Sequence, residues 1–300
     1  MNVKKYIILV LSIVSVFVAV TGGIIAANLA FQSQTSENNK AQPDVLDKTQ
    51  PFQLGKKINV LIMGTDGSEA RSDVMIVASL DSKNKKLNML SIPRDTRVKI
   101  NNKYQKINAA LTLGKEELAI RKVKEITGMP IHYYVTVNFK GFRNIIDILG
   151  GVDIDVPVNM NYDDPVQDLH IHLKKGMQHL DGKKAEQFVR YRQYPEGDIG
   201  RIKAQQAFIK ALLEQKLRLE YLSKANDIFK AIKENVKTNI TAADVAKNLS
   251  MIKALNSNNI QMYQLPGEPK MINGASYFVA DDQKTISLIE ESFGYKLSLK

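Results

Sequence analysis

A short apolar run near residue 58 constrains the fold of this chain more than any other feature. Residues 58–63 read Ile-Asn-Val-Leu-Ile-Met, and the turn-forming residues Gly64-Thr65-Asp66-Gly67 follow directly. A run of this length that ends in turn residues is typical of a strand buried within a sheet. We therefore expect residues 58–63 to form a buried strand and the fold to be built on a sheet around it.

Predicted strands alternate with predicted helices along most of the remaining chain. The strands are expected over 74–80, 87–92, 131–139, 152–156, 263–265 and 277–279. The helices are expected over 115–127, 140–149, 204–221, 225–236, 242–255 and 283–292. This alternation predicts an α/β fold, with a central mixed sheet in a three-layer α/β/α domain. Residues 159–182 are dense in Asp, His and Gly, so we expect a mobile, loop-like rim there.

The amino terminus indicates where this domain lies. Residues 6–31 are uncharged and mostly apolar, and about 20 such residues suffice to cross a bilayer. No cleavage site of the A-x-A type is evident at the end of this run. We therefore interpret it as an uncleaved signal anchor, with a cleaved signal peptide as the alternative. Lys4 and Lys5 precede the run, which places the amino terminus in the cytoplasm.

This topology predicts a single-pass protein of the cell membrane. Residues 1–5 would form a cytoplasmic tail, 6–31 a transmembrane helix, and 32–55 a flexible polar linker outside the cell. Residues 56–300 would then form one extracellular domain, because no break in composition divides them.

Composition and motifs narrow the classes of function. The formal net charge of +11 favours an anionic partner, namely nucleic acid, a membrane surface or an anionic polymer. The chain contains no cysteine, which excludes disulfides and thiolate chemistry. The sequence also lacks the phosphate-binding loop of nucleotide enzymes and the H-E-x-x-H zinc motif, which argues against both chemistries. His170 and His172 could contact one metal ion, although histidines on a polar rim more often face solvent.

Residues 187–206 stand out because they carry three arginines. Arg190, Arg192 and Arg201 lie here, whereas most basic residues elsewhere are lysines. A guanidinium group binds phosphate or carboxylate oxygens two at a time, which a surface that needs only positive charge does not require. The bias toward arginine therefore predicts a phosphate site.

A predicted helix extends this site. Asp198 is followed by apolar residues at helical spacing, so we expect a helix that begins near Gly200 with Asp198 as its cap. Arg201 and Gln205 are four residues apart and would share one face of that helix. The guanidinium groups, the helix amino terminus and the Gln205 amide would then surround one anion. The alternative is a solvated basic face with a capping aspartate.

Two aspartates and two further arginines lie near predicted strand ends. Asp66, Asp73 and Arg94 flank strands, and Arg71 lies between the two aspartates. Mg²⁺ prefers one or two carboxylates together with phosphate oxygens. The combination predicts a magnesium and diphosphate site of the kind that phosphoryl transfer requires. The alternatives are a turn-forming Asp66, and an Asp73 that caps a loop or pairs with Arg71.

Six short motifs follow one another in an order and spacing that are typical of one family. They are Arg71-Ser72-Asp73, Ser91-Ile92-Pro93-Arg94-Asp95-Thr96, Lys106-Ile107-Asn108-Ala109-Ala110, Gly150-Gly151-Val152, Leu180-Asp181-Gly182 and Gly197-Asp198-Ile199-Gly200-Arg201. Behind a predicted signal anchor, they resemble the LytR-CpsA-Psr family over residues 57–213. The resemblance implies a cell-wall glycopolymer transferase of Gram-positive bacteria. Such an enzyme moves a teichoic acid, capsular or related polymer from an undecaprenyl-diphosphate carrier onto peptidoglycan through a phosphodiester, and it uses Mg²⁺ but no nucleotide.

The resemblance further implies a role for each matching residue. Asp66 and Asp73 would hold Mg²⁺. The residues that would bind the diphosphate are Arg94, Arg190, Arg192, Arg201 and Gln205, and the catalytic residues would be Arg71, Arg94 and Asp198. Ala204 departs from the family, which often has an arginine there, and this departure bears on the choice of polymer.

Two other functions would use the same residues. A membrane-anchored binder of polyprenyl-phosphate intermediates would need the arginines but not both aspartates. A diphosphate hydrolase would use water as the acceptor. Members of the family have also been described as transcriptional regulators. We expect no nucleic-acid partner, because the basic residues are dispersed rather than gathered on a recognition helix, and the predicted anchor places the domain outside the cell.

Overall fold

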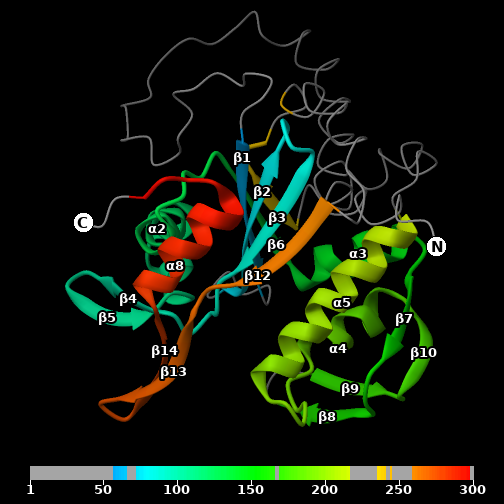
Figure 1. Ribbon diagram of the computed structural model, residues 1–300. Coiled ribbons are helices and arrows are strands. Elements are labelled where there is room, and N and C mark those ends of the chain that lie inside the picture. Colours follow the sequence, from blue (N-terminus) through cyan, green and yellow to red (C-terminus); the bar gives the residue numbers. More distant parts are fainter. Residues whose placement is uncertain are drawn as a thin grey trace, which may run out of the picture. The chain divides into compact units, whose positions relative to one another are not determined.

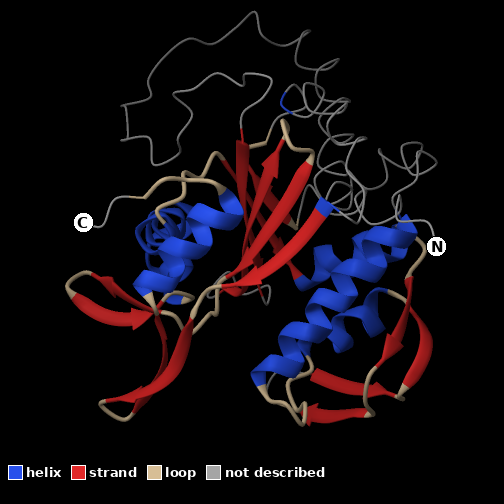
Figure 2. Ribbon diagram, in the orientation of Figure 1, coloured by secondary structure: helices blue, strands red, loops and turns tan. Residues whose placement is uncertain are grey.

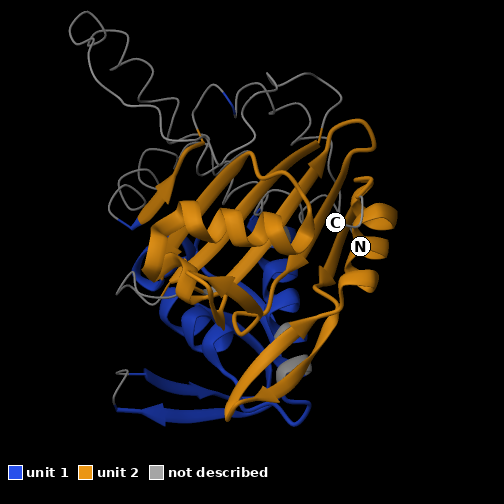
Figure 3. Cartoon of the chain, turned by 90° about the vertical axis from the view of Figure 1, so that its left-hand side faces the viewer, with its two compact units in different colours: residues 1–33, 139–235, 241–258 blue, residues 34–138, 236–240, 259–300 orange. Residues whose placement is uncertain are grey.

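The structure is a computed structural model, and it describes residues 57–65, 72–165, 169–216, 235–240, 244 and 259–297. The chain forms two compact units, which Figure 3 colours separately. The described part of one unit lies within 139–235 and 241–258, and we call it the helical unit. The described part of the other lies within 34–138, 236–240 and 259–300, and we call it the sheet unit.

Several predicted segments lie outside the described residues. They are the transmembrane helix over 6–31, the linker over 32–55 and most of the helices predicted over 225–236 and 242–255. In the part of the chain that the structure describes, no helix is long and apolar enough to span a bilayer. The anchor, the linker and the single domain over 56–300 therefore stay predictions.

The sheet unit contains a six-stranded mixed sheet with the strand order β11-β6-β1-β2-β3-β12 (Figure 1). Its strands are β1 (Lys57–Thr65), β2 (Ser72–Asp81), β3 (Lys86–Ser91), β6 (Tyr133–Asn138), β11 (Val236–Thr238) and β12 (Ile260–Gln264). β2 is antiparallel to β1 and β3, whereas β6 is parallel to β1 and β12 is parallel to β3. The predicted α/β fold with a mixed sheet is confirmed, and the apolar run 58–63 lies in the central strand β1.

Helices cover one face of this sheet and build its core (Figures 1 and 2). They are α2 (Ala109–Thr127), α8 (Asp282–Leu288) and the π-helical turn η4 (Ile289–Phe293). Leu61 and Met63 of β1 belong to the same buried cluster as Ile120 of α2 and Phe293 of η4. Burying a side chain of this size contributes about 2 kcal/mol, so this shared core fixes the helices on the sheet. The full three-layer arrangement stays a prediction.

Two hairpins of the sheet unit go beyond the sequence prediction, except that β14 (Ala275–Ala280) confirms the strand predicted over 277–279. β4 (Arg97–Ile100) pairs with β5 (Lys103–Lys106), and β13 (Gly267–Ile272) pairs with β14 (Ala275–Ala280). Asn101 and Asn102 turn the first hairpin, Asn273 and Gly274 turn the second, and all four have positive φ. Two consecutive residues with positive φ are what the favoured two-residue hairpin turn requires, and Asn and Gly adopt this conformation at the lowest cost.

The described part of the helical unit consists of helices and two hairpins. The helices are α3 (Phe139–Ile148), α4 (Gly182–Arg190) and α5 (Asp198–Lys216). The hairpins pair β7 (Val152–Val156) with β10 (Gly176–Leu180), and β8 (Met160–Asp164) with β9 (Leu169–Leu173). α3 and β7 confirm the helix predicted over 140–149 and the strand predicted over 152–156.

The loop-like rim predicted over 159–182 is wrong, because β8, β9 and β10 lie in this segment. β9 alternates the buried Leu169, Ile171 and Leu173 with the exposed His170 and His172. A period of two is the pattern of a strand that buries one face. The polar residues that suggested a loop form the exposed face of a hairpin.

Two helices begin earlier than predicted. α2 begins at Ala109 rather than at residue 115, because the chain is already helical before a kink at Gly114 and Lys115, where φ is −160° and 52°. α5 begins at Asp198 rather than near Gly200. Asp198 is therefore the first residue of the helix instead of the residue that precedes it.

Candidate active site

The residues predicted to form a site fall into two groups, one in each unit. In the sheet unit, β1 ends at Thr65, directly before Asp66. The register of β2 against β1 skips Asp73, which lies between the paired residues Ser72 and Val74 and is the extra residue of a β-bulge. Bulges occur often beside active sites, because they redirect a side chain. The backbone of Asp73 therefore lies at the end of the β1–β2 pair where β1 stops at Thr65.

Ser72 holds this bulge in place. The residue is fully buried, and its hydroxyl donates to the carbonyl oxygen of Val74 at 2.6 Å and lies 3.3 Å from that of Gly64. No local sequence signal reveals this role, because the bulge exists only in register with β1. Asp66 and Arg71 lie outside the described residues, as does the side chain of Asp73, so their predicted roles stay predictions.

Arg94 follows the strand that ends at the same edge of the sheet. β3 ends at Ser91, and the N–H of Ile92 donates to the carbonyl oxygen of Met75, near the start of β2, at 2.9 Å. The next turn carries Arg94, which is half-buried. The backbone of Arg94 therefore follows a strand that ends beside the start of β2, and the role predicted for its side chain stays a prediction.

Two of the sequence motifs brace the turn around Arg94. The carbonyl oxygen of Arg94 accepts a hydrogen bond from the N–H of Asn108 at 3.1 Å. Thr96 is buried, and its hydroxyl donates to the carbonyl oxygen of Pro93 at 2.5 Å. Because both the turn and the segment before α2 contribute these bonds, the backbone of Arg94 is fixed from two sides.

In the helical unit, one buried carboxylate binds two arginines. Glu186 is 6% exposed, and Arg190 Nη1 donates to its Oε1 at 2.8 Å, while Arg143 Nη1 donates to its Oε2. The guanidinium carbon of Arg190 also lies 4.5 Å from the centre of the Phe139 ring, which is a cation–π contact. We call Arg143, Glu186 and Arg190 the arginine cluster, and its three side chains carry a net positive formal charge.

The connection from α4 to α5 depends on tyrosines and glycines. The rings of Tyr191 and Tyr194 meet edge to face at 5.0 Å. Gly197 has a φ of 61°, which favours glycine. A Cβ atom on Gly200 would lie 2.5 Å from Cβ of Tyr194, so the first turn of α5 packs on this tyrosine only because residue 200 is glycine.

The Tyr194 hydroxyl is the buried polar atom of this connection. Tyr194 is 8% exposed, and its hydroxyl has no hydrogen-bond partner among the described residues. Burial raises the pKa of Tyr194 well above its ordinary value, with a smaller contribution from Tyr191. The phenol therefore stays neutral at physiological pH and acts as packing for α5.

The same connection and the helices beside it carry most of the residues predicted to bind the diphosphate. Gln205 of α5 donates to the carbonyl oxygen of Val189 at 3.3 Å, so its side chain lies at the carboxyl end of α4. Arg201 lies in the first turn of α5, and Arg192 is exposed in the connection. We call this region the helix junction. The side chain of Asp198 is outside the described part of the structure.

Sequence reasoning overlooks Glu186 and Arg143. The sequence does contain a signal for Glu186, because Glu186 and Arg190 are oppositely charged and four residues apart on one helix. No local signal identifies Arg143, because α3 meets α4 only through tertiary packing. There a Cβ atom on Gly182 would lie 2.3 Å from the carbonyl oxygen of Arg143. Ala204, where the family often has arginine, is 5% exposed on α5.

The two groups offer complementary chemistry. In the arginine cluster, Glu186 binds both guanidinium groups and the Phe139 ring contacts that of Arg190, so less side-chain freedom remains to be lost when an anion binds. At the sheet edge, two aspartates flank a bulged strand end, and carboxylates are the ligands that a hard cation prefers. Electrostatic stabilisation by cations, from arginines or from a metal ion, is a main contribution to phosphoryl transfer.

Comparison with known sequences matches this chain over most of its length. The LytR_cpsA_psr family matches residues 23–293. The polyisoprenyl-teichoic acid–peptidoglycan teichoic acid transferase TagV of Bacillus subtilis is 33% identical over 279 residues, which cover 87% of this chain and 70% of TagV. The transferase TagU of Bacillus licheniformis is 30% identical over 304 residues, which cover 96% of this chain and 95% of TagU.

Solved structures agree with these matches. The crystal structure of Bacillus subtilis TagV superposes with a TM-score of 0.67 at 33% identity, covering 81% of this chain and 99% of TagV as solved. A structure described as TagT bound to LI-WTA superposes with a TM-score of 0.63 at 27% identity, covering 81% of this chain and 92% of that one. The described fold is therefore the α/β fold of these proteins.

Proposed function

The chain belongs to the LytR-CpsA-Psr family, and on this premise we propose that it is a phosphotransferase acting on cell-wall glycopolymers. The proposed reaction transfers a teichoic acid, capsular or related polymer from undecaprenyl diphosphate to peptidoglycan, and we propose that it depends on Mg²⁺. The names of the relatives TagV and TagU support the reaction type. The structural observation that carries the proposal is the arginine cluster, because it holds guanidinium groups beside the helix junction in a form suited to phosphate oxygens.

The proposed reaction breaks the diphosphate at its bridging oxygen. A hydroxyl of peptidoglycan attacks the phosphorus that bears the glycan, and a new P–O bond forms. The bond from that phosphorus to the bridging oxygen breaks, and undecaprenyl phosphate leaves with the electron pair. The proton of the hydroxyl passes to a base, which is the role that we propose for Asp198. Negative charge grows on the departing phosphate, so cationic groups around it lower the barrier.

We propose that arginines of this chain stabilise the negative charge that grows on the departing phosphate. Arg190, Arg201 and Gln205 would bind the diphosphate at the helix junction, with Arg192 and Arg94 as further phosphate ligands. Fixing their positions before the substrate arrives means that no reorganisation is needed as charge develops.

The carboxylates that we assign to the sheet edge are ligands that suit a magnesium ion. Asp66 and Asp73 flank one bulged end of the β1–β2 pair, and two carboxylates are a common protein contribution to a Mg²⁺ site. When bound there, Mg²⁺ would supply positive charge to the diphosphate. We propose that Arg71 lies beside these ligands and adds a further positive charge.

We also propose that residues 6–31 anchor the chain in the cell membrane, with residues 56–300 outside the cell. The apolar run and the lysines before it support this topology. This topology suits the proposed reaction, because a polyprenyl-linked donor is itself held in the bilayer. An anchored transferase with a polar linker reaches that donor and the peptidoglycan without leaving the surface.

A transfer assay with the full chain in detergent micelles tests the proposal. A short synthetic glycan on a polyprenyl diphosphate serves as donor and peptidoglycan fragments serve as acceptor, with Mg²⁺ or with EDTA. Arg94→Ala and Asp73→Asn are compared with Lys203→Ala, whose exposed side chain on α5 pairs with Glu196 at 3.2 Å.

We expect product that requires Mg²⁺, that Lys203→Ala retains and that the other two variants lose. Circular dichroism establishes that each variant is folded. Tight donor binding without product would instead indicate an anchored binder, and release of the glycan phosphate to water would indicate a hydrolase. Either result overturns the transferase proposal.

A further inference from the structure

A separate cluster of potential metal ligands lies on the β8–β9 hairpin, and the proposed reaction uses none of its residues. His170 and His172 occupy exposed positions of β9, and Asp163 occupies an exposed position of β8. The register pairs Asp163 directly with His170. Residues two apart in a strand point to the same face, so all three side chains share the exposed face of the hairpin.

The three side chains already lie close together. Asp163 Oδ1 is 2.6 Å from His170 Nδ1 and 3.2 Å from His172 Nε2. One ligand atom from each residue lies within 4.8 Å of the others. Tetrahedral ligands about 2.1 Å from a zinc ion are separated by about 3.4 Å. Small rotations of the side chains therefore suffice to bring all three onto one ion.

The backbone beneath this cluster is fixed. Leu169, Ile171 and Leu173 of β9 are buried on the opposite face of the strand. The N–H of His172 also donates to the side-chain oxygen of Gln187 on α4 at 3.2 Å. Because the strand is held from its apolar face and at its edge, binding a metal would require side-chain movement only, which keeps the cost of ordering small.

We propose that Asp163, His170 and His172 bind one divalent transition-metal ion, with Zn²⁺ as the first candidate. Two imidazoles and a carboxylate are ligands that Zn²⁺, Ni²⁺ and Cu²⁺ favour, whereas Mg²⁺ prefers oxygen ligands alone. The site therefore differs in chemistry from the magnesium site proposed at the sheet edge. Its consequence is a bridge between β8 and β9 that stabilises the hairpin packed against α4.

The chain supplies its own control. His179 on β10 is exposed and lies 2.8 Å from the carboxylate of Asp153, so it is also a histidine paired with an aspartate on a strand. Among the described residues, however, the group around Asp163 is the one set in which three ligands converge. His179→Gln therefore removes a comparable histidine without touching the proposed site.

The test uses the full chain, purified in detergent with a tag that lacks histidine and freed of metal with a chelator. Zn²⁺ binding is followed by calorimetry, and Co²⁺ is used as a coloured substitute whose visible absorption reports nitrogen and oxygen coordination. We expect one equivalent of Zn²⁺ per chain. His170→Gln and His172→Gln should each weaken binding by about tenfold or more, whereas His179→Gln should bind as the wild type does.

A stability measurement gives a second readout. Zn²⁺ should raise the unfolding temperature of the wild type and of His179→Gln, but not that of His172→Gln. If a histidine variant does not fold, Asp163→Asn replaces it, because this change keeps the size of the side chain. Wild-type protein without saturable binding, or a His172→Gln variant that binds Zn²⁺ as tightly as the wild type, would overturn the proposal.

Discussion

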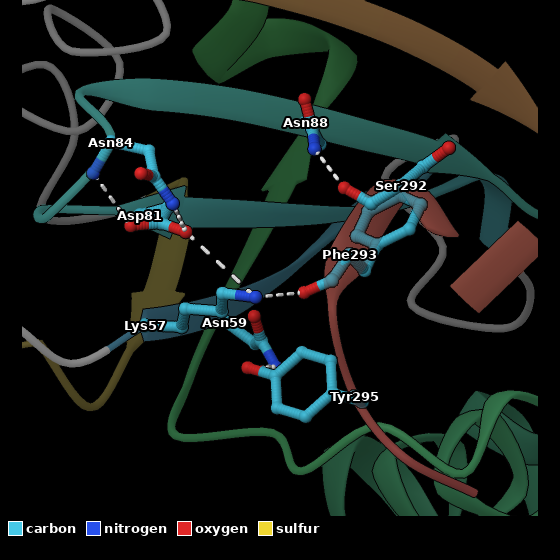
Figure 4. A network of polar contacts seen from close by, with 8 residues as sticks. All are labelled: Lys57, Asn59, Asp81, Asn84, Asn88, Ser292, Phe293 and Tyr295. Atoms are coloured by element: carbon cyan, nitrogen blue, oxygen red, sulfur yellow. Dashed lines mark hydrogen bonds and ion pairs between the residues drawn. The ribbon is translucent and has the colours of Figure 1, made fainter. Parts of the chain in front are cut away.

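Two polar clusters, one in each unit, accommodate charge in opposite ways. The first lies in the sheet unit (Figure 4), and we call it the sheet-end network; it consists of Lys57, Asn59, Asp81, Asn84, Asn88, Ser292, Phe293 and Tyr295. Asn59 donates to the carbonyl oxygen of Pro130 at 2.6 Å and to the hydroxyl of Tyr295 at 2.8 Å. Lys57 donates to the carbonyl oxygen of Phe293 and lies 3.7 Å from Asp81. One ammonium is thus balanced by one carboxylate, and the other members are neutral.

The arginine cluster of the helical unit combines two guanidinium groups with one carboxylate. Glu186 pairs with both Arg143 and Arg190, and the face of the Phe139 ring supplies a further contact to Arg190. The sheet-end network ties the carboxyl-terminal segment to the sheet, whereas the arginine cluster is the one that we propose to bind the diphosphate. The comparison teaches that charge balance distinguishes a structural cluster from a binding cluster.

The largest expected effect is on the transfer reaction, and it separates the two clusters. Arg190→Ala should lower the rate of glycan transfer by about 10² to 10³-fold, because it removes a fixed cation from the developing charge. Lys57→Ala, which alters the sheet-end network, should leave the rate per folded molecule unchanged. The measurement is the initial rate of transfer under saturating donor. Equal losses in both variants would abolish the distinction between the clusters.

The next largest effect is on stability within the helical unit. Glu186→Gln should lower the free energy of unfolding by about 3 kcal/mol, because two guanidinium groups lose their shared carboxylate. Arg143→Gln should cost less than about 1 kcal/mol, since the side chain of Arg143 is 40% exposed. Urea unfolding of the full chain in detergent measures both. A larger loss in Arg143→Gln than in Glu186→Gln would show that the carboxylate is not the centre of the cluster.

A smaller effect is expected in the sheet-end network. Asn59→Leu should cost about 1 to 3 kcal/mol, because it removes a buried donor from Pro130 and Tyr295 while keeping a similar volume. Asn84→Ala, at an exposed turn, is the control and should be nearly neutral. The same unfolding measurement applies. We expect neither variant to change diphosphate affinity, and a loss of affinity in Asn59→Leu would show that the network is more than structural.

The smallest effect is a pH dependence. Burial alone would raise the pKa of Asp81, but hydrogen bonds from Asn84 and the charge of Lys57 outweigh it and hold this pKa below the ordinary value. A lowered pKa stabilises the fold above the ordinary value of 3.8, and this contribution is lost as the pH falls below it. The wild type should therefore lose more stability than Asp81→Asn on acidification through that range. Parallel acid-unfolding curves for the two proteins would contradict this assignment.

Much of the fold can be predicted from the sequence, because the strands of the main sheet are strongly apolar. The apolar run 58–63 and the alternation of strands and helices after it predict the mixed sheet. The pair Asn273-Gly274 is a hairpin signal that could also have predicted the β13–β14 turn. The β8–β9 hairpin is harder to see, because its exposed residues His170 and His172 outweigh a weak alternation of apolar residues. Composition is a poor guide wherever a strand has one fully polar face.

The candidate site is harder to predict from the sequence, because its residues come from elements that meet only in the folded chain. The arginine bias predicts the helix junction, but Glu186 becomes evident only when Arg143 is brought to it by α3. The bulge at Asp73 depends on pairing with β1 rather than on residues next to it. The sequence marks Gly200 only as a residue near the start of a helix, whereas its structural role is to let α5 approach Tyr194. Sequence motifs identify such residues, but their structural roles become clear only from the packing around them.

The most direct test is the affinity of the full chain for a short polyprenyl diphosphate, measured by calorimetry at one fixed salt concentration. Wild type, Arg190→Gln and Lys57→Gln are compared, since both changes remove one positive charge. We predict that Arg190→Gln weakens binding by about tenfold or more, and that Lys57→Gln binds as the wild type does. Equal affinity of the wild type and Arg190→Gln would contradict the claim that the arginine cluster is built to bind diphosphate.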